Sequence, residues 1–464
     1  MTTQKPALEL AEAPPLRQWQ QEAQQRVIKA AQGKKKSFSI SACPSSGKTK
    51  FTTSTVKKLM DFHGYTRVVV VVPSDEIRHQ WSQAFNAEGL DVPTVTGSKE
   101  LWSVNGEHGI ASSYQTLSSS PDAARVDNKT ILVTDECHHG SVSQDSVWGE
   151  TVLALGAKSG FVLPLSGTMW STSGADIPFV DSSRTYEYSY HQGVADGVVA
   201  PAVIQRIPGK TTMKFAGESR VVSSSLDYNT EELNSKVLSK LLDDQEFVFS
   251  LVDAGVESLQ RIRENDCPDA GGLIVCKTIA LAHVVHKHLK DRGISSIVST
   301  SVCDVDSKEL KKYREDDSIL FAVGVKKMVE GWDAPRCSVG VWLTNISTEL
   351  FWWQTISRCT RVHRTTEGEI QPALWYTPKS LFTDLNHTEE TWLDPEVYNE
   401  ARAKLPIVSL PEVVHDIDWG PLEPVFKANA KYAAPAPNFS GEFKVLGRIF
   451  SPCLKDYTND FGTY

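Results

Sequence analysis

The sequence of 464 residues lacks several features that mark whole classes of protein. No apolar run approaches the roughly 18 consecutive residues that a membrane-spanning helix needs. Residues 1–15 have no apolar core of signal-peptide length, and their Pro, Glu and Ala content predicts a flexible leader. The eight cysteines include no CxxC pair, so neither a disulfide framework nor a zinc ribbon is indicated. We therefore expect a cytoplasmic chain with reduced thiols.

The chain also lacks the excess of basic residues that many nucleic-acid-binding proteins carry. It has 48 Lys and Arg against 57 Asp and Glu, and -7 of the net charge of -9 falls in residues 366–464. The nearly neutral remainder can still present a basic groove on one face, so this acidity does not exclude nucleic acid. With 40% hydrophobic and 23% charged residues the composition is that of a soluble globular protein, and the length predicts about three folding units.

Two stretches of the chain alternate β-rich runs with helical patterns, which is typical of parallel α/β domains. Five consecutive valines at 68–72 indicate a strand that is buried on both faces. The strands that we predict are 37–42, 67–72, 130–134 and 161–165 in the first stretch, and 272–276, 295–299, 318–323 and 339–343 in the second, with helices at 278–292 and 348–361. The pattern predicts two α/β domains of similar size.

The segment from Ala42 to Thr49 (ACPSSGKT) lies between a predicted strand and a predicted helix. A phosphate-binding loop uses this order of residues: loop amides surround phosphate oxygens, a lysine meets their charge, and a hydroxyl binds Mg2+. Ala42 stands where the usual pattern has its first glycine. An ordinary strand-to-helix turn is the alternative, which this context disfavours. The candidate ATP-binding residues are Pro44, Ser45, Ser46, Gly47, Lys48 and Thr49, with Lys48 also catalytic and Thr49 also a metal ligand.

Asp135 and Glu136 follow directly after the apolar strand at 130–134. At this position an ATPase needs one carboxylate near Mg2+ and another that accepts a proton from the attacking water. We therefore assign Asp135 to the metal and Glu136 to proton transfer. An ordinary acidic turn is the alternative, and it would be favoured if no phosphate loop preceded the pair. The two histidines that come next lack the spacing of zinc ligands.

In this order the motifs resemble those of the superfamily 2 helicases and translocases, whose second motif is spelled DEAD, DEAH or, as here, DECH. Within that superfamily, the segment YHQGVADGVVAP at 190–201 is similar to the branch that holds the restriction-enzyme motor subunits, RadD and UvsW. The resemblance implies an α/β fold of two tandem RecA-like parallel-sheet domains, with a C-terminal extension of unassigned fold. It also implies ATP and Mg2+ as cofactors and nucleic acid as a partner.

The resemblance assigns roles to further residues in the first half of the chain. The implied residues are Arg17 and Gln20 for the adenine, Ser74, Tyr114 and Gln115 for a nucleic-acid strand, and Ser166 and Thr168 for the coupling of hydrolysis to movement.

The second half of the chain supplies the remaining motifs. Gly331 and Asp333 match the fifth motif, which binds ATP, and Gln354, Arg358 and Arg361 match the QxxxRxxR form of the sixth, in which Gln354 belongs to the coupling group. Arg358 and Arg361 lie three residues apart on the predicted helix and so share a face. Brought from a second domain to a γ-phosphate they would be catalytic arginine fingers, an effect of about 10³ to 10⁵ in rate. The alternative, two solvated arginines, is disfavoured because the earlier motifs stand in register.

These motifs predict the domain organisation and the function together. We expect a leader at 1–15, a RecA-like ATP-binding domain at 16–203, a connector with helices at 204–268, a second RecA-like domain at 269–377 and an acidic extension at 378–464. The predicted function is that of a nucleic-acid helicase or translocase that hydrolyses ATP in the cleft between its two domains. Only the branch resemblance favours DNA over RNA, because such motifs contact the backbone.

Two other classes of function compete with this prediction. The chain could be an ATPase motor subunit, or a nucleotide-gated nucleic-acid-binding switch, of a larger repair, restriction or defence complex that binds protein partners through the C-terminal extension. A non-catalytic scaffold is disfavoured because the sequence retains every acidic, basic and hydroxyl group that the chemistry needs.

Overall fold

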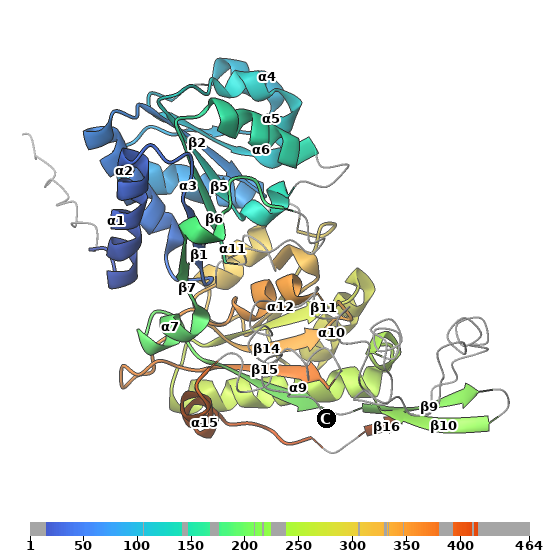
Figure 1. The fold of residues 1–464 in the computed structure, drawn as a ribbon. Coiled ribbons are helices and arrows are strands. Elements are labelled where there is room, and N and C mark those ends of the chain that lie inside the picture. Colours follow the sequence, from blue (N-terminus) through green and yellow to red (C-terminus); the bar gives the residue numbers. More distant parts are fainter. Residues whose placement is uncertain are drawn as a thin grey trace, which may run out of the picture. The chain divides into compact units, whose positions relative to one another are not determined.

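The computed structural model of the chain describes residues 15–104, 106–141, 147–167, 176–207, 209–215, 218–223, 238–304, 307–328, 332, 334–346, 348–379, 393–410 and 413–415 (Figure 1). These residues form two compact units. Most of residues 15–188 belong to the first unit, and residues 189–415 to the second. Within the described ranges no helix is both long and apolar enough to cross a membrane.

The first unit is built on a parallel sheet, in which the described strands have the order β3-β4-β2-β5-β6-β1-β7. Its strands are β1 (Ser39–Ala42), β2 (Arg67–Val72), β3 (Thr94–Val95), β4 (Gly109–Ser113), β5 (Thr130–Asp135), β6 (Phe161–Ser166) and β7 (Thr185–Tyr188). The valines of β2 are buried on both faces because β4 and β5 pair with its two edges and helices cover both sides of the sheet (Figure 1). All the carboxyl ends of these strands therefore meet at one edge.

Except for α1, each helix of this unit follows one of its strands in the chain. They are α1 (Gln18–Gln32), which precedes the sheet, and α2 (Lys48–His63), α3 (Asp75–Ala87), α4 (Ser98–Ser103), α5 (Tyr114–Ser119) and α6 (Val147–Lys158). Hydroxyl side chains cap two of them: Ser74 accepts from the backbone of α3, and Ser113 from that of α5. Helix α2 ends at Gly64, whose φ of 77° is a left-handed conformation that favours glycine.

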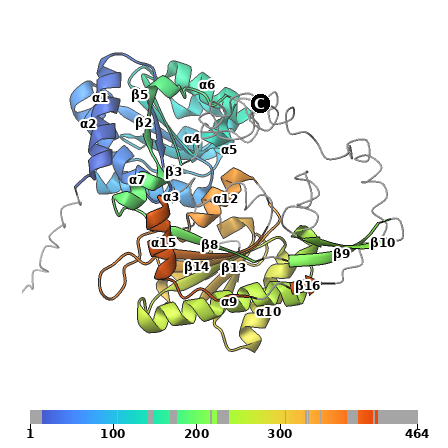
Figure 2. The same ribbon diagram turned by 60° about the horizontal axis from the view of Figure 1, so that its bottom comes forward.

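The second unit contains another parallel sheet, with the described strands in the order β12-β13-β11-β14-β15-β8 (Figure 2). Its strands are β8 (Ala202–Ile207), β11 (Gly271–Cys276), β12 (Ser296–Ser299), β13 (Phe321–Gly324), β14 (Cys337–Leu343) and β15 (Ala373–Pro378). Its helices are α7 (Tyr190–Ala195), α9 (Gln245–Asn265), α10 (Ile279–Asp291), α11 (Lys308–Glu315), α12 (Glu349–Ile356) and α15 (Pro395–Ala403). Each strand predicted from the sequence is present in one of the two sheets, and the α/β fold class is confirmed.

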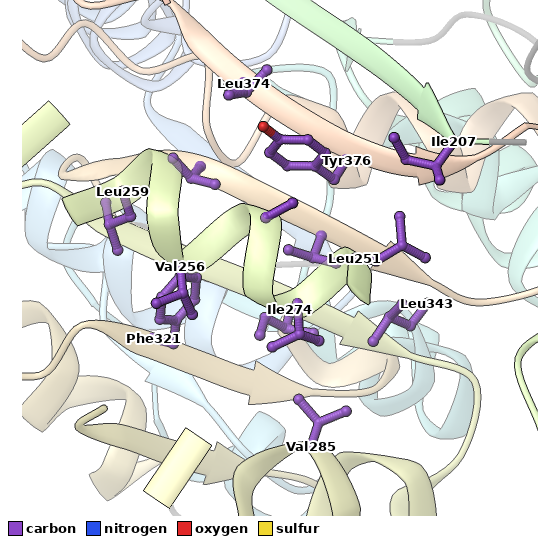
Figure 3. Close-up of a cluster of buried hydrophobic side chains, with 14 of the residues drawn as sticks. Ile207, Leu251, Val256, Leu259, Ile274, Val285, Phe321, Leu343, Leu374 and Tyr376 are labelled. Carbon is purple, nitrogen blue, oxygen red and sulfur yellow. The ribbon is translucent and has the colours of Figure 1, made fainter. Parts of the chain in front are cut away.

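Helix α9 packs along one face of the second sheet. Its apolar side chains, among them Leu251 and Leu259, are buried against Ile274 of β11 and Leu343 of β14 (Figure 3). Each Å2 of apolar surface that is buried contributes roughly 25 cal/mol to the free energy of folding. The segment 204–268, which the sequence suggested as a connector, thus contains most of an edge strand (β8) and a core helix of the second unit.

Part of the acidic extension also packs on the second unit. Helix α15 contributes Tyr398 and Ala401 to the core that α9 forms. A small sheet lies beyond, in which β9 (Gly209–Phe215) pairs with β10 (Glu218–Ser223) and β16 (Val413–His415) (Figure 2).

The predicted helix at 348–361 is wrong in its length, since α12 ends at Ile356. Beyond that residue the backbone hydrogen bonds span three residues instead of the four of an α-helix. The N–H of Arg358 donates to Thr355 O, and the N–H of Cys359 donates to Ile356 O. The hydroxyls of Ser357 and Thr360 bond backbone carbonyls three residues earlier, which competes with a continuing helix. Arg358 and Arg361 therefore do not share a helical face, and they lie in an irregular segment.

Candidate active site

The loop between β1 and α2 has a backbone that only particular residues adopt. Ser45 and Gly47 have positive φ angles of 66° and 98°. The left-handed φ of 98° favours glycine at position 47, where a Cβ would also lie 2.8 Å from Gln20 Nε2 and 3.3 Å from Arg17 Nη1. Thr49 is the second residue of α2, and Pro44 and Ser46 complete the loop. A loop that ends in the first turn of a 16-residue helix presents backbone N–H groups suited to an anion.

Arg17 and Gln20 approach this loop from α1, as the sequence suggested for an ATP site. Gln20 is 3% exposed, and its Nε2 donates to Gly47 O at 2.9 Å while its Oε1 accepts from the backbone of Arg17 at 2.8 Å. The neighbouring Trp19 stacks on Tyr188 of β7, with ring centroids 4.9 Å apart. Gln20 thus fixes the carbonyl of the loop's glycine, a contact that the sequence alone did not indicate.

Lys48, Glu136 and Ser166 meet at the carboxyl edge of the first sheet. The order β5-β6-β1 brings together the strand ends that carry them. Lys48 Nζ lies 4.0 Å from Glu136 Oε1 and donates to Ala42 O at 3.1 Å. Ser166 Oγ donates to Glu136 Oε2 at 3.0 Å and lies 3.1 Å from His138 Nδ1. The cation, the carboxylate and the hydroxyl of three separate motifs therefore form one connected network.

Asp135, at the end of β5, is held by three groups. Trp81 Nε1 donates to its Oδ2 at 2.8 Å, the N–H of Glu136 donates to its Oδ1 at 3.1 Å, and Tyr114 Oη donates to its backbone carbonyl at 3.0 Å. These donors fix the orientation of the carboxylate. A carboxylate and the Thr49 hydroxyl are oxygen ligands of the kind that Mg2+ prefers, so the residues fit the predicted metal.

The pKa values of the two adjacent carboxyl groups are shifted in opposite directions. Burial, followed by repulsion from Glu136, raises the pKa of Asp135 to about 6. Burial also acts to raise the pKa of Glu136, but attraction by Lys48 and His138 and the bond from Ser166 outweigh it, and that pKa is lowered. Without a bound cation, Glu136 therefore stays ionised to lower pH than Asp135 does.

Of the three predicted nucleic-acid contacts, the structure leaves two near the surface. Ser74 follows β2 and caps α3, and Gln115 is exposed in the first turn of α5, after the neighbouring strand β4. Tyr114 is only 1% exposed, so its predicted contact with a nucleic-acid strand is not supported. Its ring is packed in the core of the first unit because its hydroxyl bonds Asp135.

The predicted residues of the second unit are described in part. Arg358 Nη1 donates to Trp332 O at 2.7 Å, so the sixth motif is bonded to the fifth, and Arg361 is half-buried three residues later. Gln354 lies near the end of α12 and is 8% exposed. Gly331 and Asp333 lie outside the described residues, as does Thr168 of the first unit.

Two residues contact the acidic pair although the sequence prediction did not connect them with it. Trp81 bonds Asp135, and His138 contacts both Glu136 and Ser166. His138 had a signal, because it ends the DECH motif, but the sequence led us to consider it only as a zinc ligand. Trp81 follows Gln80 in a segment that resembles the motif that holds a nucleic-acid strand, but its bond to Asp135, 54 residues later in the chain, had no signal in the sequence.

Comparison with known proteins finds restriction enzymes among the relatives of this chain. Residues 13–170 match the family model described as type III restriction enzyme, res subunit. An uncharacterised protein of Mycobacterium tuberculosis is 29% identical over 368 residues, which is 76% of this chain and 60% of the relative. The endonuclease subunit of the type I restriction enzyme EcoAI of Escherichia coli is 24% identical over 66% of this chain and 40% of its own length. The chain thus spans 60% or less of these relatives.

Solved structures share the fold at low sequence identity. A fragment assigned as the HsdR subunit of a type I restriction enzyme from Vibrio vulnificus matches 86% of this chain and 68% of its own, with a TM-score of 0.56 and 16% identity. The ATP-dependent type ISP restriction-modification enzyme LlaBIII, bound to DNA, matches 97% of this chain and 34% of its own, with a TM-score of 0.53 and 13% identity. The predicted resemblance to superfamily 2 motors, and to the motor subunits of restriction enzymes among them, is confirmed.

Proposed function

We propose that this chain is a superfamily 2 helicase-like motor of the restriction-enzyme type. In this proposal it hydrolyses ATP and uses the energy to move along or unwind DNA. The observation that carries the proposal is the network at the edge of the first sheet. There Lys48 Nζ lies 4.0 Å from Glu136 Oε1, and Ser166 bonds the same carboxylate at 3.0 Å. A cation for phosphate and an ionised carboxylate for water are thus side by side, as ATP hydrolysis requires.

In this proposal the first unit binds the nucleotide. The loop amides and Lys48 hold the β- and γ-phosphates, and Arg17 and Gln20 contact the adenine. The closeness of Arg17 and Gln20 to Gly47 of the loop supports this role. Thr49 and Asp135 would hold Mg2+, which when bound shields the phosphate charge. Glu136 accepts a proton from the attacking water, and its lowered pKa keeps it ready as a base although burial opposes ionisation.

The second unit supplies the groups that act as the transition state forms. We propose that Arg358 and Arg361 stabilise the charge that develops on the γ-phosphate, and that Asp333 and Gly331 contact the nucleotide. Gln354 and the Ser166–Thr168 motif would couple ATP binding and hydrolysis to changes in how the protein holds the nucleic acid. The bond between Ser166 and Glu136 supports this coupling role, because any change at Glu136 reaches Ser166 directly.

Ser74 and Gln115 are the proposed contacts to the nucleic-acid backbone. They follow β2 and β4, which are neighbours in the sheet, so both lie at its carboxyl edge. DNA is preferred because the solved structure of the similarly folded LlaBIII contains bound DNA. Because backbone contacts carry little sequence information, we expect binding to depend weakly on base sequence.

A second candidate function is that of a motor subunit without unwinding activity of its own. It is favoured by the lengths of the relatives, since this chain covers 40% of the EcoAI subunit and 34% of LlaBIII. In this case the chain would hydrolyse ATP on DNA, but strand separation or cleavage would need further domains or protein partners.

ATP turnover measured with a panel of nucleic acids tests the proposal and separates the two functions. We expect hydrolysis to be low alone and stimulated by duplex, forked or single-stranded DNA, and less by RNA of the same length. A strand-displacement assay on the forked substrate then distinguishes a helicase from a motor subunit. If no nucleic acid stimulates hydrolysis, the proposed function is wrong.

Glu136→Gln should separate binding from chemistry. The amide keeps an oxygen that accepts from Ser166, but it cannot take a proton from water, so turnover should fall by about 10² or more while nucleotide and DNA still bind. Phosphate release and filter binding measure the two quantities. Glu150→Gln, at an exposed position of α6, is the matched control. Turnover of Glu136→Gln within about tenfold of wild type would exclude its role as the base.

A further inference from the structure

The segment that carries Arg361 has no regular structure, yet it is bonded on both sides of that residue. On one side Ala200 N–H donates to Thr360 O at 2.8 Å. On the other, Gln371 N–H donates to His363 O at 2.8 Å. Arg361 therefore sits on a short stretch of backbone whose position depends on tertiary contacts rather than on a helix.

The side chain of His363 adds two further contacts. Its Nε2 lies 3.0 Å from Asp269 Oδ1, and its Nδ1 lies 3.2 Å from Ser338 Oγ. Asp269 is in the loop before β11, and Ser338 is the second residue of β14. One imidazole ring thus joins the segment after α12 to two neighbouring elements of the second sheet.

The loop that carries Asp269 is itself rigidly held. Arg336 is 8% exposed and donates to the carbonyls of Tyr313, Asp316 and Ile319, and its Nη1 donates to Asp269 O at 3.2 Å. From the same loop, the carbonyl of Asp266 accepts from Thr366 N–H at 2.9 Å. His363 is therefore bonded to a fixed point, which a positioning role requires.

The three side chains Ser338, His363 and Asp269 have the composition of a hydrolytic triad, but not its accessibility. Ser338 is 2% exposed and lies within β14, so its hydroxyl cannot reach a substrate. The side chain of Asp269, in contrast, is 54% exposed. The arrangement holds a segment in place, and the nearest predicted catalytic group on that segment is Arg361.

We propose that His363 is a positioning residue for Arg361. By bonding Asp269 and Ser338 it fixes the backbone two residues after the arginine, so that the guanidinium is presented at the right place when the γ-phosphate reacts. The inference rests on the proposed function, because it takes Arg361 as the arginine finger. Misplacement of a catalytic group by about 1 Å can lower the rate by about 10². Loss of the contacts of His363 with Asp269 and Ser338 should therefore have a measurable effect on turnover.

His363→Ala should therefore lower kcat for DNA-stimulated ATP hydrolysis by about 10- to 100-fold and leave the KM for ATP within about twofold. His363→Gln, whose amide can still donate to Asp269, should recover most of the loss. Asp269→Ala, at an exposed position that should not disturb folding, should reproduce the loss. The matched control is His288→Ala, because His288 Nε2 bonds Asp253 Oδ1 at 2.7 Å on helices α10 and α9 of the same unit, and its kcat should not change.

A double variant makes the test specific to Arg361. If His363 acts through Arg361, then His363→Ala should cost less than about twofold when Arg361 is already alanine, because the two residues act as one unit. An additive loss in the double variant, a wild-type kcat in folded Asp269→Ala, or a raised KM with unchanged kcat in His363→Ala would each overturn the inference. Wild-type protein that shows no DNA-stimulated hydrolysis would instead overturn the proposed function.

Discussion

Lys48→Ala should reduce DNA-stimulated ATP turnover to background and weaken nucleotide binding. Lys48 opens α2, and its Nζ lies between Ala42 O at 3.1 Å and Glu136 Oε1 at 4.0 Å, which places one positive charge between the loop and the base. Alanine removes the partner of the β- and γ-phosphates. It also removes the attraction that, against burial, lowers the pKa of Glu136. Two separate contributions to turnover are therefore lost in one substitution.

Steady-state phosphate release and titration with a fluorescent ATP analogue measure the two expected losses. Lys57→Ala is the control, because Lys57 lies on the same helix with a side chain that is 39% exposed and pairs with Asp61 at 3.5 Å. It should keep wild-type turnover. DNA-stimulated hydrolysis at the wild-type rate in Lys48→Ala would remove the assignment of the phosphate loop.

The sheets could be predicted because their strands carry a strong local signal. Strands β2, β5, β11 and β14 are runs of β-branched and apolar residues, and they are buried on both faces in the structure. Strands β3, β4 and β7 of the first sheet, β8 and β15 of the second, and the strands of the small sheet escaped prediction. Strands β8 and β15 pair with each other across about 170 residues of chain, a pairing that no local pattern indicates. Local pattern was therefore sufficient for β2, β5, β11 and β14, but it missed several edge strands and the interior strands β4 and β15.

The candidate site was predicted in its motifs but not in its contacts. The residue types and order indicated Lys48, Asp135, Glu136 and Ser166, and the parallel order of β1, β5 and β6 brings their motifs together. The burial of Tyr114 was not predicted, because its motif indicates where the chain turns at the end of β4 and not which way the ring points. The ring points inward because its hydroxyl finds the carbonyl of Asp135, a partner that is known only once the sheet is assembled.

The end of α12 shows the same limit on a smaller scale. The sequence 348–361 retains helical periodicity, but Ser357 and Thr360 bond the backbone locally, and the helix ends at Ile356. The consequence is functional, because Arg361 then depends on His363 and its partners for its position. Periodicity detects a helix, whereas hydroxyl groups decide where it stops.

Arg361→Ala should lower turnover by about 10³, the lower edge of the arginine-finger range, while ATP affinity stays nearly intact. In the proposed function the first unit holds most of the nucleotide through its own loop and Lys48, so ATP affinity should depend little on Arg361. A guanidinium from the second unit matters chiefly as charge develops on the γ-phosphate, which affects kcat more than binding. Arg358→Ala should lose less, because Arg358 already donates to Trp332 O at 2.7 Å and has a structural partner within its own unit.

The measurements on Arg361→Ala must distinguish the loss of a catalytic guanidinium from damage to the fold. Arg261→Ala is the control, since Arg261 lies on α9 of the same unit with a side chain that is 49% exposed, and its removal should leave turnover unchanged. Titration of a fluorescent ATP analogue alongside steady-state hydrolysis gives affinity and rate for each variant. If the single variants of Arg358 and Arg361 and their double variant all hydrolyse ATP at the wild-type rate, then the second unit does not complete the active site. In that case the motor would need another source of positive charge at the γ-phosphate, because Lys48 alone must already serve the phosphates in the ground state.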